Sequence, residues 1–228
     1  DIGTIYNPLA IITIGFPFLF DDVPNIRYHI AINIGIILLA GFCFYKLSRF
    51  ILKKKEWNYF LAGFFIILLL YNDGRYVILE PLSVVFQLLA LIFYLNFLKT
   101  FSIWRMFIVG ICISLAFLSK QFGLFIAVPI GLSMLLNKKI LFKQMIITSI
   151  GFAVPIVIFY QIIHTNQFSV FDFVQSILGK GVQIDQGNGT GLELDFKSRM
   201  MFLLIFVATN LYITLLPFSL KTVLNSKF

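Results

Sequence analysis

Charged residues are scarce in this sequence. They make up 12% of its 228 residues, and 60% of the residues are hydrophobic, whereas a soluble domain has about 25% charged residues. A chain of this length cannot bury so much apolar surface in a water-surrounded core, so a soluble domain is excluded and lipid must be the main solvent. The sequence therefore predicts an all-α fold, a polytopic bundle of transmembrane helices.

Cysteine and histidine are also rare, with two of each. Cys43 and Cys112 each lie inside an apolar run, so we interpret them as small buried side chains without a disulfide. His29 and His164 are isolated and are interpreted as packing residues. No metal-ligand spacing, P-loop, HExxH or GxSxG pattern is present, so zinc hydrolases, P-loop nucleotidases and serine hydrolases have no support.

The net charge of +8 does not indicate nucleic-acid binding. Lysine and arginine occur in short clusters between apolar runs. This distribution is typical of the cytoplasmic loops of a membrane protein under the positive-inside rule. We expect an integral membrane protein of the bacterial plasma (inner) membrane, as part of the cell envelope, with an internal eukaryotic membrane as the alternative.

Apolar runs separated by polar segments predict about eight spans in a single membrane-embedded domain, 1–228. The chain begins with Asp1 rather than Met, and we interpret it as a fragment of a longer protein. The long polar segment 164–199 is predicted to be an outer loop, and the spacing of its apolar residues over 168–178 predicts a short amphipathic helix. The runs are 8–20, 30–45, 57–71, 82–98, two short helices within 106–136, 144–163 and 200–220.

The apolar stretch 106–136 is too long for one membrane span and short for two. A single helix over this range would measure about 46 Å, against a hydrocarbon core of about 30 Å. Lys120 is the one charged residue in the range. We therefore predict two short helices that break near Ser119–Gly123, with Lys120 at or slightly below the membrane surface and facing a cavity.

The loops predict an orientation. With alternating spans, all the basic segments fall on one side, the cytoplasm, and the less basic segments fall on the outer side. Arg75, Glu80 and Lys120 then gather at the outer face, which suggests a shared polar pocket. The basic segments are 46–55, 99–105, 137–143 and 221–227, and the others are 21–27, 72–76, 119–123 and 164–199.

Four groups of polar residues are candidates for this pocket. Arg75 could bind an anion, since its planar fork donates two hydrogen bonds to a phosphate, and Glu80 could orient a sugar or a cation. Lys120 could bind the same phosphate, with Gln121 as a hydrogen-bonding amide. Alternatively, Arg75 and Glu80 belong to a solvated turn before a helix whose first turn holds Pro81, and Lys120 is a loop lysine that reaches the surface.

The other two groups lie near the start of the chain. Asp21 and Asp22 could act as a base or a metal ligand; otherwise they form a helix-ending turn with Pro24. Tyr6 and Asn7 either orient a substrate or belong to a helix start with Pro8 in its first turn. No cofactor is assigned, and a divalent cation is left open.

Three stretches, in this order, resemble the membrane-embedded C-type glycosyltransferases that use polyprenyl-phosphate sugars, especially the protein-mannosyltransferase-like family and its bacterial relatives. Tyr6-Asn7-Pro8-Leu9 with Arg27 is similar to the Y-x-P-L … R start of that family. Gly74-Arg75 with Glu80-Pro81-Leu82 is similar to its middle segment. The stretch 110–124 resembles G-x-x-x-G-L-A-x-L-T-K-Q-x-G-L, although Ser114 replaces the second glycine. The likeness covers roughly residues 1–160.

The resemblance implies a single displacement in which a carboxylate deprotonates an acceptor hydroxyl that attacks the anomeric carbon. The lipid phosphate leaves, stabilised by Arg75 or Lys120. The family's main carboxylate would lie upstream of Asp1, so the catalytic residue is not assigned. The resemblance also places the Tyr6–Leu9 motif on the outer side, whereas the alternation of charged loops places the start of run 8–20 inside.

Together these features predict a glycosyltransferase that moves a hexose or pentose, with inversion, from a polyprenyl-phosphate donor to a glycan, lipid or protein acceptor at the outer membrane face. The expected partners are the donor lipid, the acceptor and membrane lipids, and no nucleic acid. The alternative is a transporter or flippase for lipid-linked saccharides, which would need polar residues along a path at mid-membrane. A non-enzymatic membrane scaffold would need no clustered outer charges.

Overall fold

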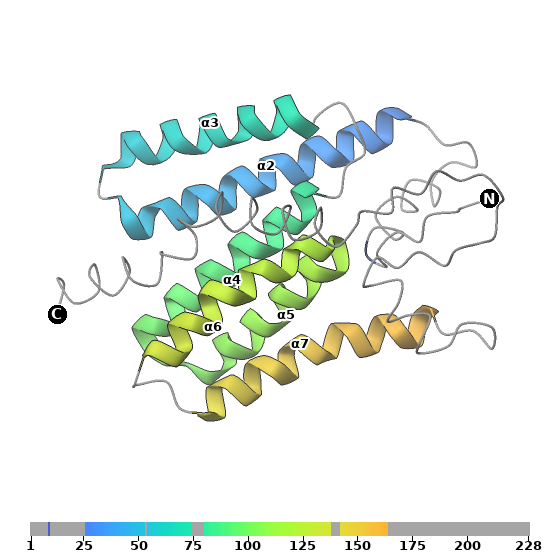
Figure 1. The fold of residues 1–228 in the computed structure, drawn as a ribbon. Helices are drawn as coiled ribbons and strands as arrows, with labels where there is room; N and C mark the ends of the chain where they lie inside the picture. Colours follow the sequence, from blue (N-terminus) through green and yellow to red (C-terminus); the bar gives the residue numbers. More distant parts are fainter. Residues whose placement is uncertain (1–8, 10–25, 53, 74–79, 138–141, 164–228) are drawn as a thin grey trace, which may run out of the picture. The chain divides into compact units, whose positions relative to one another are not determined.

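The computed structural model describes residues 9, 26–52, 54–73, 80–137 and 142–163 (Figure 1). Within these ranges every element of secondary structure is a helix, which confirms the predicted all-α class. The helices are α2 (Ile26–Ile51), α3 (Lys55–Asp73), α4 (Glu80–Thr100), α5 (Ile103–Ser119), the 3-10 helix η2 (Gln121–Ile126), α6 (Ala127–Leu136) and α7 (Phe142–Ile163).

The predicted apolar runs 30–45, 57–71, 82–98 and 144–163 correspond to α2, α3, α4 and α7. Lipid offers no hydrogen bonds to the backbone, so an apolar run in a membrane forms a helix that satisfies its own amides and carbonyls. The helices exceed the runs at their ends because they include flanking polar residues. Pro81 is the second residue of α4, as expected for the first turn, where a missing N–H costs nothing.

Among the described residues, three helices are long and apolar enough to cross a membrane: Arg27–Ile51, Pro81–Thr100 and Phe142–Gln161. Two shorter apolar helices span Ile103–Ser119 and Gly123–Leu136. The expected number of about eight spans is therefore not confirmed. Helix α3 begins with Lys55, Glu56 and Asn58, which lower its hydropathy. Run 200–220 and the amphipathic helix expected at 168–178 lie outside the described residues, as does run 8–20 apart from residue 9.

The chain breaks within 106–136 where the length argument places the break. Helix α5 ends at Ser119, and Lys120 adopts an extended conformation with φ −156° and ψ 138°. Helix η2 follows and leads into α6. The prediction of two short helices with a break near Ser119–Gly123 is confirmed.

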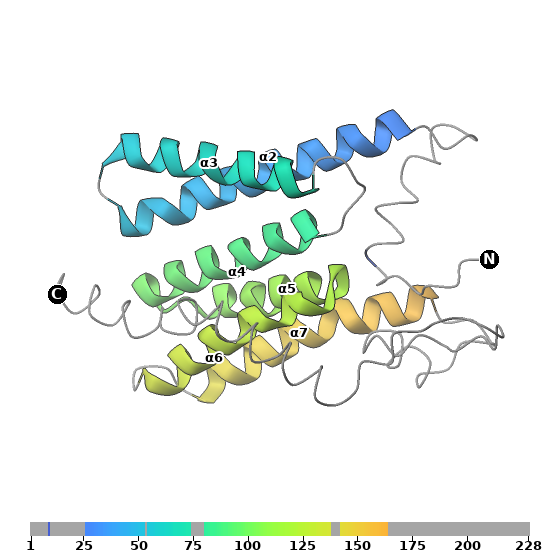
Figure 2. The ribbon, with the colours of Figure 1, turned by 45° about the horizontal axis from the view of Figure 1, so that its top comes forward.

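The described helices fall into two compact units, with α6 in one and all the others in the second. In the larger unit, α5 packs between α4 and α7, and α2 packs between α3 and α4. Helices α2 and α3 form an antiparallel hairpin (Figures 1 and 2). A single domain stays a prediction.

Side-chain contacts show which helix ends lie together. The Nζ of Lys99 lies 4.4 Å from the centroid of the Phe50 ring, so α2 and α4 end at the same end of the larger unit. The rings of Tyr45 and Tyr59 stack at 4.9 Å, which brings the start of α3 there as well. We call this the basic end, because it holds parts of the basic segments 46–55 and 99–105.

Helices α5 and α7 run in the same direction and approach closely at two glycines. A Cβ on Gly110 would collide with the backbone of Thr148 and lie 2.7 Å from the amide nitrogen of Phe152, and a Cβ on Gly151 would collide with the carbonyl of Phe107. Small residues of this kind allow membrane helices to pack backbone to backbone. Further along, Leu118 and Phe159 share a buried cluster.

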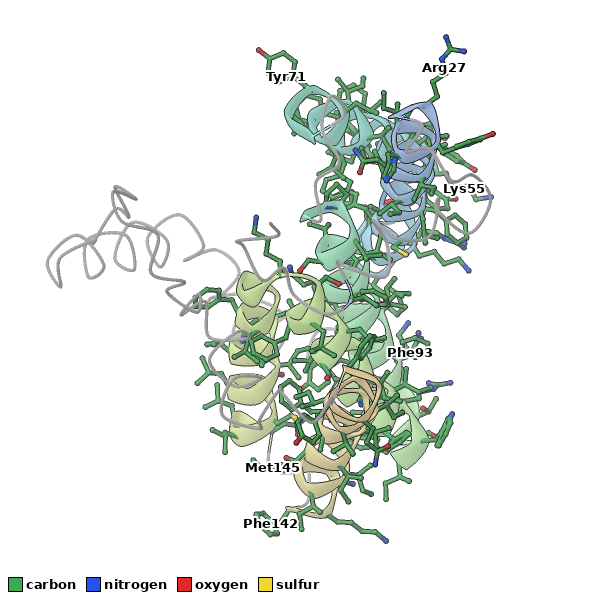
Figure 3. The ribbon with its side chains drawn as sticks, turned by 90° about the vertical axis from the view of Figure 1, so that its right-hand side faces the viewer. Arg27, Lys55, Tyr71, Phe93, Phe142 and Met145 are labelled. Atoms are coloured by element: carbon green, nitrogen blue, oxygen red, sulfur yellow. The ribbon has the colours of Figure 1, made fainter. Side chains whose placement is uncertain are left out.

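Apolar side chains cover much of the outer surface of the larger unit, as expected for a protein that faces acyl chains. Helix α3 shows this along its length, where Phe60, Phe64 and Ile67 are exposed. At its end, Tyr71 projects away from the neighbouring helix (Figure 3). Cys43 and Cys112, by contrast, are buried free thiols.

Candidate functional site

The start of α4 and the end of α5 are joined by a hydrogen bond. The Oγ of Ser83 donates to the carbonyl oxygen of Ala116 at 3.0 Å. The same oxygen accepts the backbone N–H of Lys120 at 3.0 Å. A carbonyl oxygen has two lone pairs, so this oxygen keeps its intrahelical partner and accepts a second hydrogen bond from another helix. We call this end of the larger unit, opposite the basic end, the site end.

The chain turns sharply after Lys120 to form η2. The backbone N–H of Gly123 donates to the carbonyl of Lys120 at 2.8 Å. A Cβ on Gly123 would collide with the carbonyl of Ala116 and lie 2.7 Å from the Oγ of Ser83. Glycine is therefore required at position 123 for the chain to fold back over the junction of α4 and α5.

Ser83 is 3% exposed and has a second partner. Its Oγ accepts a hydrogen bond from the Nε2 of Gln87 at 3.2 Å. Gln87 lies one turn further along α4, so the two side chains share a helix face. The amide fixes the hydroxyl so that its proton is directed at Ala116, and the hydroxyl is satisfied both as donor and as acceptor.

These contacts bring together elements that carry several predicted site residues. Glu80 begins α4, three residues before Ser83, and Lys120 follows the last residue of α5. Lys120 is partly buried, and Gln121 is the first residue of η2. The predicted residues Tyr6, Asn7, Asp21, Asp22 and Arg75 lie outside the described residues.

Leu9 ties the start of the chain to the site end. It packs against the cluster formed by Leu118 and Phe159, near the ends of α5 and α7. The residue that closes the Tyr6–Leu9 motif therefore lies at the same end as Lys120. The alternation of charged loops places the start of run 8–20 on the side opposite Lys120, and the structure contradicts that expectation. The outer side implied by the family resemblance stays a prediction.

A family model described as dolichyl-phosphate-mannose-protein mannosyltransferase matches residues 6–178. The chain belongs to this family. The match covers all of the described residues and confirms the resemblance. No curated protein and no solved structure matches the chain. Membership in the mannosyltransferase family makes the chain a membrane glycosyltransferase that takes its sugar from a polyprenyl-phosphate donor.

All of the predicted site residues lie inside the range that matches the mannosyltransferase family. The described part of this range contains no group of three or more His, Cys, Asp or Glu side chains that could hold a metal ion. Lys120 supplies a cation at the described site end. A lysine ammonium suits a departing phosphate, since it is a compact positive charge with three N–H donors.

Two residues of this junction were missed by sequence reasoning, Ser83 and Gly123. Ser83 could have been found as a polar residue in an apolar run, spaced four residues from Gln87 and three from Glu80. Its partner, however, is a backbone carbonyl 33 residues away, and nothing in the local sequence identifies such a partner. Gly123 was noted as the end of the predicted break and as part of the family pattern, but the close approach that requires a glycine there appears only in three dimensions.

Proposed function

We propose that this mannosyltransferase-family chain transfers a hexose or pentose, with inversion, from a polyprenyl-phosphate donor to a glycan, lipid or protein acceptor at the outer membrane face. The observation that carries the proposal is the hydrogen bond from Ser83 to Ala116. It holds the start of α4, which follows Arg75 and carries Glu80, against the end of α5, which leads into Lys120. Both elements lie in the family match.

The reaction is a single displacement. The acceptor oxygen forms a bond to the anomeric carbon as the bond between that carbon and the phosphate oxygen breaks. The acceptor proton passes to a carboxylate base, and the bonding electron pair leaves with the polyprenyl phosphate, which gains negative charge. Asp21 and Asp22 are the candidate carboxylates in this sequence, unless the base precedes Asp1.

Lys120 and Arg75 stabilise the departing phosphate in this proposal. Charge develops on the phosphate as the glycosidic bond breaks, so a cation there lowers the barrier more than it strengthens donor binding. Glu80, Gln121, Tyr6 and Asn7 orient the sugar and the acceptor. Partial burial of Lys120 strengthens its attraction for the phosphate, because the local dielectric is lower than that of water.

The test is turnover of a defined donor by the full-length protein in liposomes. Dolichyl-phosphate mannose, the donor in the family description, is the first probe, followed by polyprenyl-phosphate pentoses, with release of polyprenyl phosphate as the readout. We expect Lys120→Ala to lower kcat by about 10²–10³-fold, the usual cost of losing one group that stabilises transition-state charge. Lys120→Arg, which keeps the charge, should recover part of the loss.

The matched control is Lys143→Ala, which removes an exposed lysine in the first turn of α7. Its kcat should equal that of the wild type. Wild-type turnover in Lys120→Ala would remove Lys120 from the mechanism. Absence of sugar transfer from every donor by the wild type would refute the proposed function.

A further inference from the structure

The elements at the site end need a device that fixes them relative to one another. Helices α4 and α5 contact each other along their length, mostly through apolar side chains. Such contacts are non-directional, and in lipid they lack the hydrophobic drive that holds soluble helices together. Arg105 joins the start of α5 to the end of α4 by donating to the carbonyl of Asn96 at 2.6 Å, but this bond lies at the basic end. A small slide at the other end of α5 would shift Lys120 relative to the start of α4.

The hydrogen bond from Ser83 to Ala116 opposes that slide. The carbonyl oxygen of Ala116 receives both the Oγ of Ser83 and the backbone N–H of Lys120. A single oxygen therefore connects the first turns of α4, the last turn of α5 and the backbone of Lys120. Because Ser83 is 3% exposed, water cannot readily replace the lost acceptor if the helices separate, so sliding would leave the buried O–H of Ser83 without a partner.

Gly123 provides a second, independent observation. The chain that follows Lys120 passes so close to Ser83 that a Cβ at position 123 would lie 2.7 Å from the serine Oγ. The hydroxyl is therefore enclosed by α4, by the end of α5 and by η2. Lys120 lies between the two points, Ala116 and Gly123, at which the chain touches Ser83.

We infer that Ser83 is a positioning residue that sets the place of Lys120 relative to the start of α4, and thereby relative to the phosphate of the donor. The inference rests on the proposed function, since it assigns Ser83 an effect on transfer through Lys120. Ser83 itself contacts no reacting atom in this account. Misplacement of a catalytic group by about 1 Å can cost about 100-fold in rate, so a hydrogen bond that fixes a helix end can matter as much as a direct contact.

The test is a double-mutant cycle measured as donor turnover by the full-length protein in liposomes. Ser83→Ala in the wild-type background should lower kcat by about 10- to 100-fold with a smaller change in KM. In the Lys120→Ala background, the same change should have little further effect, because the group that Ser83 positions is already gone. Ser83→Thr, which keeps the hydroxyl, should recover part of the activity.

Ser119→Ala is the matched control. Ser119 is also buried and lies next to Lys120, but its Oγ donates to the carbonyl of Leu115 within its own helix, at 2.7 Å. Its kcat should stay close to the wild-type value. Unfolding midpoints of all variants, measured in detergent, separate a loss of folding from a loss of positioning.

The outcomes distinguish this inference from the function on which it rests. If Lys120→Ala reduces turnover but Ser83→Ala does not, or if the two losses multiply, Ser83 does not act through Lys120 and only this inference is overturned. If Lys120→Ala itself leaves turnover unchanged, the proposed phosphate site is wrong and the inference falls with it.

Discussion

Ser114 is an uncompensated polar group in the middle of α5. It is fully buried, and its Oγ has no hydrogen-bond partner. A buried hydroxyl without a partner costs about 1–3 kcal/mol. In the family pattern that the stretch 110–124 resembles, this position is glycine, which has no side chain to satisfy.

We expect Ser114→Ala to stabilise the protein. The change removes the unsatisfied hydroxyl and leaves a methyl group of similar size, so the unfolding midpoint in detergent should rise by a few degrees. Ser149→Ala is the control, because the Oγ of Ser149 is exposed and donates to the carbonyl of Met145 at 3.1 Å. A fall in the midpoint for Ser114→Ala would show that the hydroxyl has a partner in the membrane protein and would contradict the prediction.

At the scale of single helices, the contact between α5 and α7 depends on the absence of a side chain. We expect Gly110→Ala to destabilise the protein by about 1–3 kcal/mol, the usual cost of forcing atoms into a packed interface. The added methyl group would collide with the backbone of Thr148, and a helix backbone cannot move aside as a flexible side chain can. The measurement is the unfolding midpoint in detergent.

Gly35→Ala is the matched control, because nothing lies within 4 Å of a Cβ at that position of α2. Alanine also has the higher helix propensity, so this variant should be as stable as the wild type or slightly more so. Equal effects of the two substitutions would mean that α5 and α7 do not pack at Gly110.

The helices themselves follow from the sequence, but their neighbours do not. Apolar runs longer than about 15 residues have one solution in lipid, which is a helix. The break at Lys120 follows from a length that fits neither one span nor two. Helix packing is different, because apolar residues occupy every side of α4 and α7, and periodicity cannot mark the face that meets another helix. The crossing at Gly110 and Gly151 is visible only in the structure.

At the scale of the whole molecule, the sequence is a better guide to which helix ends lie together than to the contacts between those ends. Charge in the loops places the residues near Glu80 and Lys120 on one side. In the structure, Ser83 joins the start of α4, which includes Glu80, to the end of α5, which precedes Lys120. Loop charge failed at the first run, where Leu9 packs at the site end. The resemblance places the Tyr6–Leu9 motif on the outer side from the motif itself and not from a count of crossings, and that placement stays a prediction.

The last prediction concerns the orientation of the larger unit, with the site end outside and the basic end in the cytoplasm. It uses Tyr71→Cys at the end of α3, where the native side chain is 84% exposed, and Lys54→Cys in the turn between α2 and α3, where the native side chain is also exposed. Both changes are made in a background without the buried native thiols, Cys43→Ala with Cys112→Ala. Intact cells are treated with a membrane-impermeant maleimide, and labelling is compared before and after permeabilisation.

Tyr71→Cys should be labelled in intact cells, and Lys54→Cys should be labelled only after permeabilisation. The two positions flank α3, with Lys54 just before its start and Tyr71 near its end. The pair therefore reports which end of the larger unit faces outward. The parent variant without cysteines gives the background. Labelling of Lys54→Cys in intact cells, with Tyr71→Cys protected, would place Lys120 on the cytoplasmic side and would require the donor to be used there, because the sugar-bearing phosphate must lie on the same side as the cation that stabilises it.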